Sequence, residues 1–154
     1  MPRTIEEWKV PSTSIEEISS TIKVWLSRNQ FEILEWYSGG SWIDYNKLGF
    51  RMSLRPKPGS IVAVSYRISG TVVFEISLSK ENDDTIIHGE FYAIGGGPLA
   101  GKEFDFCPTL PSLDQLARKR GYTLMANFEK SLSLMSAKRT VATDERIKNK
   151  AKII

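Results

Sequence analysis

The sequence predicts a two-layer α+β fold, in which an antiparallel sheet of about five strands packs against an N-terminal helix and a long C-terminal helix on one face. Apolar residues recur every three or four positions near the start, alternate with polar ones between residues 31 and 94, and return to helical spacing after residue 112. A run of strands between helices is typical of α+β domains. The 154 residues fit one hydrophobic core.

The first expected element is a helix from Ile15 to Arg28. Ser14 and Glu17 have the spacing of a capping box at its start. Asn29 should end it, because asparagine tolerates the left-handed conformation common after a last turn. The apolar residues share one face of this helix because they are three or four positions apart: Ile15, Ile18, Ile22, Trp25 and Leu26.

Five strands are expected next, because alternating segments are separated by turn residues. The second of them is long and should bend or bulge near Gly49. The expected strands are Phe31 to Tyr37, a segment that ends at Leu54, Ser60 to Ile68, Val72 to Lys80, and Thr85 to Ile94.

The turns between these strands predict how the strands pair, because directly opposite residues of an antiparallel pair point to the same face. A turn at residues 81–84 pairs Phe74 with Phe91. A three-residue turn around Gly70 pairs Ile68 with Val72, and the turn at Lys57 pairs the second strand with the third. The result is one apolar face for both helices and one polar face that no helix covers.

A second long helix should begin at Ser112, with Gln115 completing another capping box. Gly121 lies inside its apolar stripe, and we expect it to mark a close contact and not a break. The stripe consists of Leu113, Leu116, Ala117, Leu124, Phe128, Leu132 and Met135. We expect residues 1–137 to form a single α+β domain and residues 138–154 to form a basic, flexible tail.

This order of elements, a sheet followed by a long C-terminal helix, is similar to that of helix-grip domains and of TATA-binding-protein-like domains. No motif carries the resemblance. The resemblance to helix-grip domains implies a ligand cavity between helix and sheet.

The polar face of the predicted sheet supplies the candidate binding residues. Glu75 is expected opposite Glu90, and two facing carboxylates require a nearby cation. Arg67, diagonal to Glu75, is the expected partner. The candidate residues on this face are Arg51, Arg67, Glu75, His88, Glu90 and Tyr92. An ordinary solvated sheet face would show the same alternation.

The composition limits the cofactors and partners. With one cysteine and one histidine, the chain has neither an internal disulfide nor a structural zinc site, and we predict no cofactor. Residues 138–154 hold six basic and two acidic residues, so this tail carries more than the whole net charge of +3. Nucleic acid is therefore a candidate partner only through the tail. No apolar run suggests a membrane span or a signal peptide, so we expect a cytoplasmic protein.

Two functional hypotheses remain. The first is a small binding module, not an enzyme, that contacts an unknown macromolecule or a second copy of itself. It would use the polar sheet face, the basic tail, or an aromatic hairpin formed by Trp36, Tyr37, Trp42 and Tyr45.

The alternative is a carrier or enzyme that binds a small apolar ligand in a cavity between the C-terminal helix and the sheet. This hypothesis expects incomplete packing around Gly89 and Gly121. The cavity would be lined by Tyr66, Phe74, Phe91 and Phe128.

Overall fold

The structure is a computed structural model that describes residues 3–11, 13–35, 43–47, 50–54, 56, 59–67, 70–95, 102–106 and 115–142. Its elements, in chain order, are β1 (Thr4–Val10), α1 (Ile15–Arg28), β2 (Glu32–Glu35), β3 (Ile43–Lys47), β4 (Phe50–Leu54), β5 (Ile61–Ser65), β6 (Thr71–Glu81), β7 (Asp84–Ile94), β8 (Glu103–Phe104), α2 (Gln115–Ser133) and β9 (Lys138–Ala142). The α+β class and the antiparallel sheet are as predicted.

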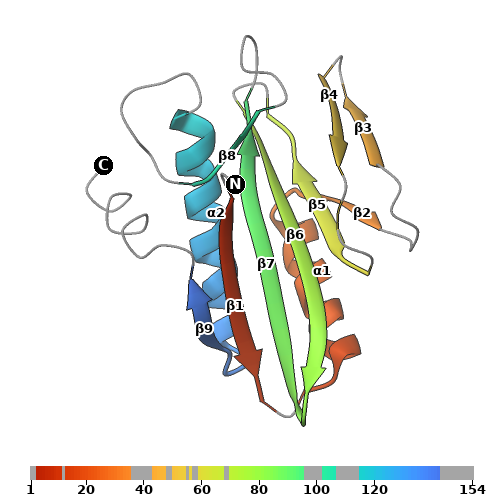
Figure 1. Cartoon of the computed structure of the whole chain (residues 1–154), viewed down its shortest axis with the longest axis vertical. Helices are drawn as coiled ribbons and strands as arrows, with labels where there is room; N and C mark the ends of the chain where they lie inside the picture. The colour runs from red at the N-terminus through yellow and green to blue at the C-terminus, as the bar shows by residue number, and fades with distance from the viewer. Residues whose placement is uncertain are drawn as a thin grey trace.

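The main sheet has seven strands in the order β2-β5-β6-β7-β1-β9, and β8 also pairs with β7 (Figure 1). All of its strand pairs within the described residues are antiparallel. The expected number of strands was too low, because β1, β8 and β9 were not predicted. Lys138–Ala142, which begins the segment expected to be a tail, instead pairs with β1 as β9. Residues 143–154 lie outside the described residues.

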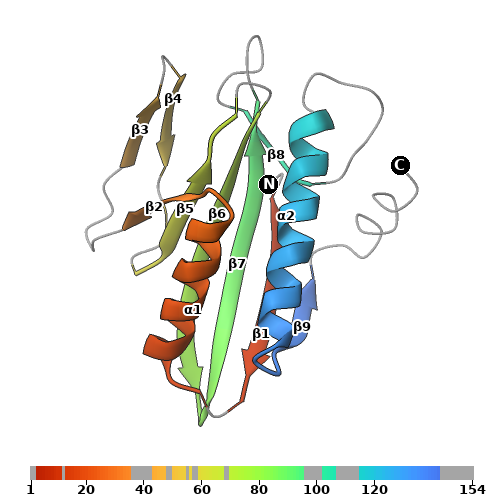
Figure 2. The same cartoon turned by 180° about the vertical axis from the view of Figure 1, so that it is seen from behind.

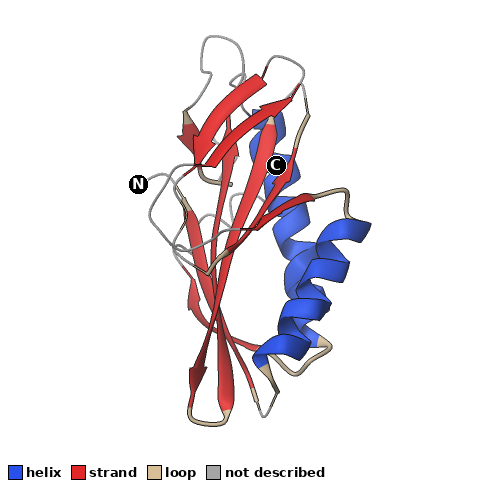
Figure 3. Ribbon diagram, turned by 90° about the vertical axis from the view of Figure 1, so that its right-hand side faces the viewer, coloured by secondary structure: helices blue, strands red, loops and turns tan. Residues whose placement is uncertain are grey.

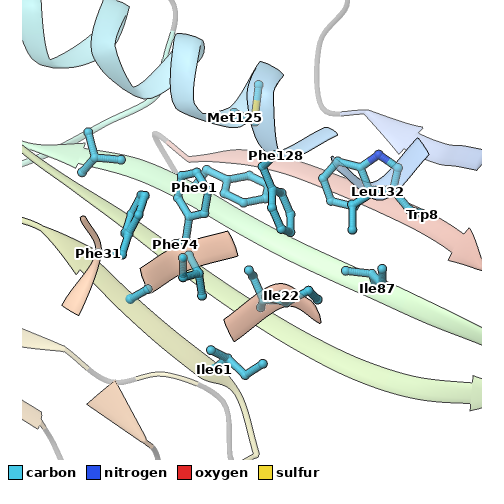
Figure 4. Packing of buried hydrophobic residues seen from close by; sticks show 14 of the residues in the cluster. Trp8, Ile22, Phe31, Ile61, Phe74, Ile87, Phe91, Met125, Phe128 and Leu132 are labelled. Atoms are coloured by element: carbon cyan, nitrogen blue, oxygen red, sulfur yellow. The ribbon is translucent and has the colours of Figure 1, made fainter. Parts of the chain in front are cut away.

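Both helices cover the same face of the sheet (Figures 2 and 3). The core between them contains aromatic rings from both layers, which Figure 4 shows at close range. Phe74 of β6 lies 4.6 Å from Phe91 of β7 and 5.7 Å from Phe128 of α2, measured between ring centroids. Burial of such rings is the main stabilising contribution to a domain of this size.

The first helix has the predicted bounds. The Ser14 side chain accepts a hydrogen bond from the backbone N–H of Glu17 at 3.2 Å, which satisfies one of the free amides of the first turn. Ile18, Ile22 and Leu26 are buried. The left-handed residue after the helix is Gln30, one position later than expected.

The predicted pairing of β6 with β7 is confirmed, including Phe74 opposite Phe91 and Glu75 opposite Glu90. The predicted pairing of β5 with β6 is wrong, because Ser65 and not Ile68 lies opposite Val72. This shift of three positions turns β5 over. The cause lies in the sequence of β5, which is buried along its whole length and therefore shows no alternation from which to choose a face.

The expected long second strand is two strands. β3 and β4 pair only with each other, as a separate two-stranded sheet, and β5 pairs with β2 in place of β4. Tyr45 and Leu54 of this hairpin pack on the sheet face opposite the helices. That face is therefore partly covered, whereas the sequence predicted an open one. The residues beneath the hairpin are Val62, Val64, Val73, Tyr92 and Ile94.

The second helix continues through Gly121, as expected. A Cβ atom at this position would lie 2.2 Å from Cε1 of Phe106, so the glycine permits close contact between α2 and the segment after β8. Arg120 on the same turn donates hydrogen bonds to the carbonyl oxygens of Ser65 at 3.2 Å and Gly70 at 3.3 Å. Leu116 was expected in the buried stripe, but 67% of its surface is exposed.

Two further observations concern the limits of α2 and the length of the helices. Ser112, the expected first residue of the capping box, lies outside the described residues. Within the described part of the chain, neither helix has the length and apolar character needed to cross a lipid bilayer.

We expect Gly121→Ala to lower the free energy of unfolding by up to about 2 kcal/mol. Alanine gains about 1 kcal/mol of helix propensity, but its methyl group overlaps the fully buried ring of Phe106, and overpacking costs about 1 to 3 kcal/mol. Urea denaturation would measure the difference. Asn127→Ala, at an exposed position of the same helix, is the control and should not destabilise. A Gly121→Ala protein about 1 kcal/mol more stable than the parent, as helix propensity alone would make it, would contradict the close contact.

Candidate ionic site on the sheet face

Arg3 occupies the centre of an ionic cluster on the face opposite the helices. Its guanidinium donates two hydrogen bonds to the Glu103 carboxylate, from Nε at 2.8 Å and from Nη2 at 3.0 Å. The same group lies 4.1 Å from the centre of the Tyr92 ring. A bidentate pair and a cation–π contact together fix the orientation of the guanidinium plane.

Two further glutamates from adjacent strands reach the same guanidinium. Nη1 of Arg3 lies 3.4 Å from Glu75 of β6 and 3.2 Å from Glu90 of β7. The need for a cation beside this facing pair is confirmed, but its identity was predicted wrongly. Arg67 instead donates a hydrogen bond to the side chain of Gln30 at 2.8 Å.

Glu75 is the most deeply buried carboxylate of the cluster, with 8% of its side chain exposed. Burial raises the pKa of this carboxyl above its usual value, since a charged group loses hydration there, although the hydrogen bond from the Tyr92 hydroxyl and the charge of Arg3 act in the opposite direction. Burial and the neighbouring Glu75 also raise the pKa of Tyr92. Tyr92 therefore keeps its proton and serves as a hydrogen-bond donor.

His88 of β7 extends the cluster toward the turn between β6 and β7. Its Nδ1 lies 2.7 Å from Oε2 of Glu7 on β1, and its Nε2 lies 3.3 Å from Oε2 of Glu90. Strand pairing explains the contact, because Glu7 is directly opposite His88. When both nitrogens carry protons, the ring donates to both carboxylates and adds a second cation to the cluster.

The structure brings together four of the six predicted face residues: Glu75, His88, Glu90 and Tyr92. Arg67 lies outside the cluster, as its bond to Gln30 shows. Arg51 belongs to β4, opposite Asn46, and is not in line with Glu75. Its side chain is outside the description. Ser65 of β5 accepts hydrogen bonds from Arg120 of α2 through its carbonyl and its hydroxyl oxygen.

Sequence reasoning missed three members of the cluster, Arg3, Glu7 and Glu103. Arg3 and Glu7 were missed because β1 was not predicted. Buried and half-buried residues alternate along the whole of β1. Two of the buried positions are the polar residues Thr4 and Glu6, so the sequence there does not alternate between apolar and polar residues. Trp8 and Val10 were the available signal for a strand. Glu103 is on a two-residue strand, which is too short to show a period.

Of the residues of the aromatic and cavity hypotheses, Tyr45 packs on the hairpin side of the sheet, whereas Phe74, Phe91 and Phe128 pack on the helix side. Tyr45, a residue of β3, is buried against the main sheet. Trp36, Tyr37 and Trp42 lie outside the described residues. Burial, the neighbouring Glu32 and, to a smaller extent, the nearby Tyr66 raise the pKa of Tyr45 to about 12.

Phe74, Phe91 and Phe128 lie on the helix side and contact one another. The Phe91 ring occupies the space above Gly89, and the Phe106 ring occupies the space beside Gly121.

The cluster holds four glutamates and one arginine, so carboxylates are in excess: three of them contact Arg3, and Glu7 contacts His88. With the carboxyls ionised and His88 neutral, Glu7, Glu75, Glu90, Glu103 and Arg3 carry a formal charge of −3. Glu7 and Glu103 are each about 30% exposed. Such a surface can accept hydrogen bonds from a cationic group. Among the described residues, no three His, Cys, Asp or Glu side chains form a group that could hold a metal ion.

Replacement of Arg3 should destabilise the fold more than a surface substitution does. Arg3→Ala leaves Glu75, Glu90 and Glu103 without their shared cation, and we expect a loss of about 2 to 4 kcal/mol in the free energy of unfolding. Chemical denaturation measures it. Lys130→Ala, at an exposed position of α2, is the control. A loss below about 0.5 kcal/mol for Arg3→Ala would mean that the cluster is not energetically coupled.

Glu75 should make stability depend on pH. Its pKa is higher in the folded protein than in the unfolded chain, so the folded state binds the proton more tightly, and stability falls as the pH rises through the raised folded pKa. We expect Glu75→Gln to remove this part of the dependence, so that the variant gains stability relative to the parent between acidic and neutral pH. Denaturation curves at a series of pH values test this. Glu81→Gln, exposed on the same strand, should run parallel to the parent, and a parallel Glu75→Gln curve would refute the assignment.

No family model, curated protein or solved structure matches this chain. The chemistry of the ionic cluster therefore has to be inferred from its own residues, distances and charges.

Proposed function

We propose that this protein is a non-enzymatic binding module, and that it docks a basic segment of another protein on the sheet face opposite the helices. We call the binding surface the acidic face and define it as Glu7, Glu75, His88, Glu90 and Glu103. The observation that carries the proposal is the excess of carboxylates around the single guanidinium of Arg3. An acidic surface attracts and orients basic partners.

The neighbours of the acidic face suit lysine and arginine side chains, which bury their aliphatic stems while the charged ends pair. Ile5 is directly opposite Glu90, and Ile86 is directly opposite Lys9, both on the same face as the carboxylates. Both isoleucines are partly exposed. An incoming basic side chain would thus find an apolar contact beside its ion pair.

The hairpin leaves room for such a partner. β3 and β4 lie over one end of this face, whereas the described chain leaves the other end of β6 and β7 uncovered (Figure 3). On that uncovered part, Ser77 is half-buried and Ser79 is exposed. A partner can therefore approach from the end away from the hairpin and reach His88 and Glu7 first.

Binding is favoured over catalysis by the contacts within the cluster. Arg3 pairs with Glu75 and Glu90, and His88 contacts Glu7 and Glu90, so these side chains are engaged with one another and none of these contacts activates a nucleophile. The alternative, a helix-grip-like carrier with a cavity between α2 and the sheet, has less support, because phenylalanine rings occupy the space at Gly89 and Gly121.

The proposal is tested with a labelled oligoarginine peptide as the probe and fluorescence anisotropy as the measurement. We expect binding that weakens as salt increases, and at least about a tenfold weaker affinity for the double variant Glu7→Gln/Glu90→Gln. The matched control is Glu16→Gln/Asp83→Asn, which removes the same charge from exposed positions elsewhere. Circular dichroism establishes that each variant is folded. Equal losses in the two double variants would indicate attraction by net charge alone and would reject the acidic face.

A further inference from the structure

A hollow of about 480 Å³ separates the two helices on the outer surface of the helical layer. Figure 2 shows α1 and α2 lying side by side on that surface. The walls are mainly apolar, with Thr21, Val24, Trp25 and Arg28 on the α1 side and Leu134 and Met135 on the other. The hollow faces away from the acidic face, which is on the far side of the sheet.

Two apolar side chains at the walls of this hollow are exposed. Val24 has 49% of its surface exposed, and Leu134, just after α2, has 87% exposed. Exposed apolar side chains that flank a hollow mark an interaction surface, in contrast to scattered single ones. Leu116 is such a single exposed residue. At the rise per residue of an α-helix, it lies about 27 Å from Leu134 along the helix axis.

The exposed face of α1 carries small side chains in the middle and a charged side chain at each end. Ser20, Thr21 and Val24 are exposed between Glu17, about one turn earlier, and Arg28, about one turn later. Small side chains allow two helices to approach closely. Within the described residues, neither the Glu17 carboxylate nor the Arg28 guanidinium has a recorded ion-pair partner.

We propose that the occupant of this hollow is a second copy of this chain, whose α1 packs antiparallel against the first α1 about a two-fold axis. The axis passes midway between Glu17 and Arg28. It places Glu17 of each copy beside Arg28 of the other, and Thr21 beside Val24. A two-fold interface is self-complementary in this way, because each contact occurs twice.

Charge complementarity selects a second copy over other occupants. A small apolar ligand would fill the hollow without using Glu17 or Arg28. In the dimer, both charges are paired, and Leu134 lies against the α1 of the second copy. Since the acidic face is on the other side of the sheet, each copy of the dimer keeps its acidic face accessible.

Sedimentation equilibrium over a range of protein concentrations tests the proposal through a charge exchange. The parent should dimerise, and Arg28→Glu should raise the dimer dissociation constant about tenfold, because two Glu–Glu contacts replace two ion pairs. The double variant Glu17→Arg/Arg28→Glu exchanges the two signs and should restore the parent's constant to within about threefold. A parent that is monomeric at every concentration, or a double variant as weak as Arg28→Glu, would overturn the antiparallel arrangement.

A pair of apolar substitutions tests the hollow itself. Leu134→Ser should weaken the dimer about tenfold, and Leu116→Ser, which removes another exposed leucine at the far end of α2, should leave the constant unchanged. Equal effects of the two substitutions would overturn the assignment of the hollow. Glu7→Gln/Glu90→Gln should also leave the constant unchanged, so the dimer and the acidic face fail or succeed independently.

Discussion

The single guanidinium of Arg3 allows three glutamates to lie side by side on one sheet face. Glu75 and Glu90 are directly opposite on neighbouring strands, and Glu103 arrives from β8. Without a cation between them, these carboxylates would repel one another and would lose hydration without compensation. Arg3 therefore couples the start of β1 to β6, β7 and β8. The acidic face exists because this coupling makes a dense group of carboxylates tolerable.

The sheet carries different chemistry on its two faces because its strands differ in how they are buried. β1 and most of β7 alternate between the aromatic core and the half-exposed ionic cluster. β5 is buried on both faces, since Ala63 belongs to the helix side while Val62 and Val64 belong to the side beneath the β3–β4 hairpin. One end of the outer face thus becomes a second small core. The remaining end keeps its charges, and the proposed docking surface lies there.

The sequence allowed prediction of the α+β class, the bounds of α1, and the pairing of β6 with β7. These features depend on short-range signals, such as the Ser14 cap and the alternation around a tight turn, which directly reflect local geometry. The position of β5 and the partner of Glu75 were not predictable in the same way. A strand buried on both faces shows no period, and Arg3 is distant from Glu75 in sequence, so neither spacing nor composition links them. Four members of the ionic cluster were nevertheless identified, because Glu75, His88, Glu90 and Tyr92 are on β6 and β7, the one pair of strands whose register was predicted correctly.

The position of β1 has a consequence for the order in which the chain folds. β1 lies between β7 and β9 in the sheet, although both partners are far from it in the sequence. During synthesis β1 leaves the ribosome long before Asp84–Ile94 exists, so it has to wait unpaired while α1 forms and the β6–β7 hairpin is made. Proteins dominated by such distant pairings fold slowly, since the loop has to close before the contacts stabilise it. Until β1 docks, both an edge of β7 and the apolar surface of Trp8 are exposed, and exposed strand edges and apolar surface favour aggregation.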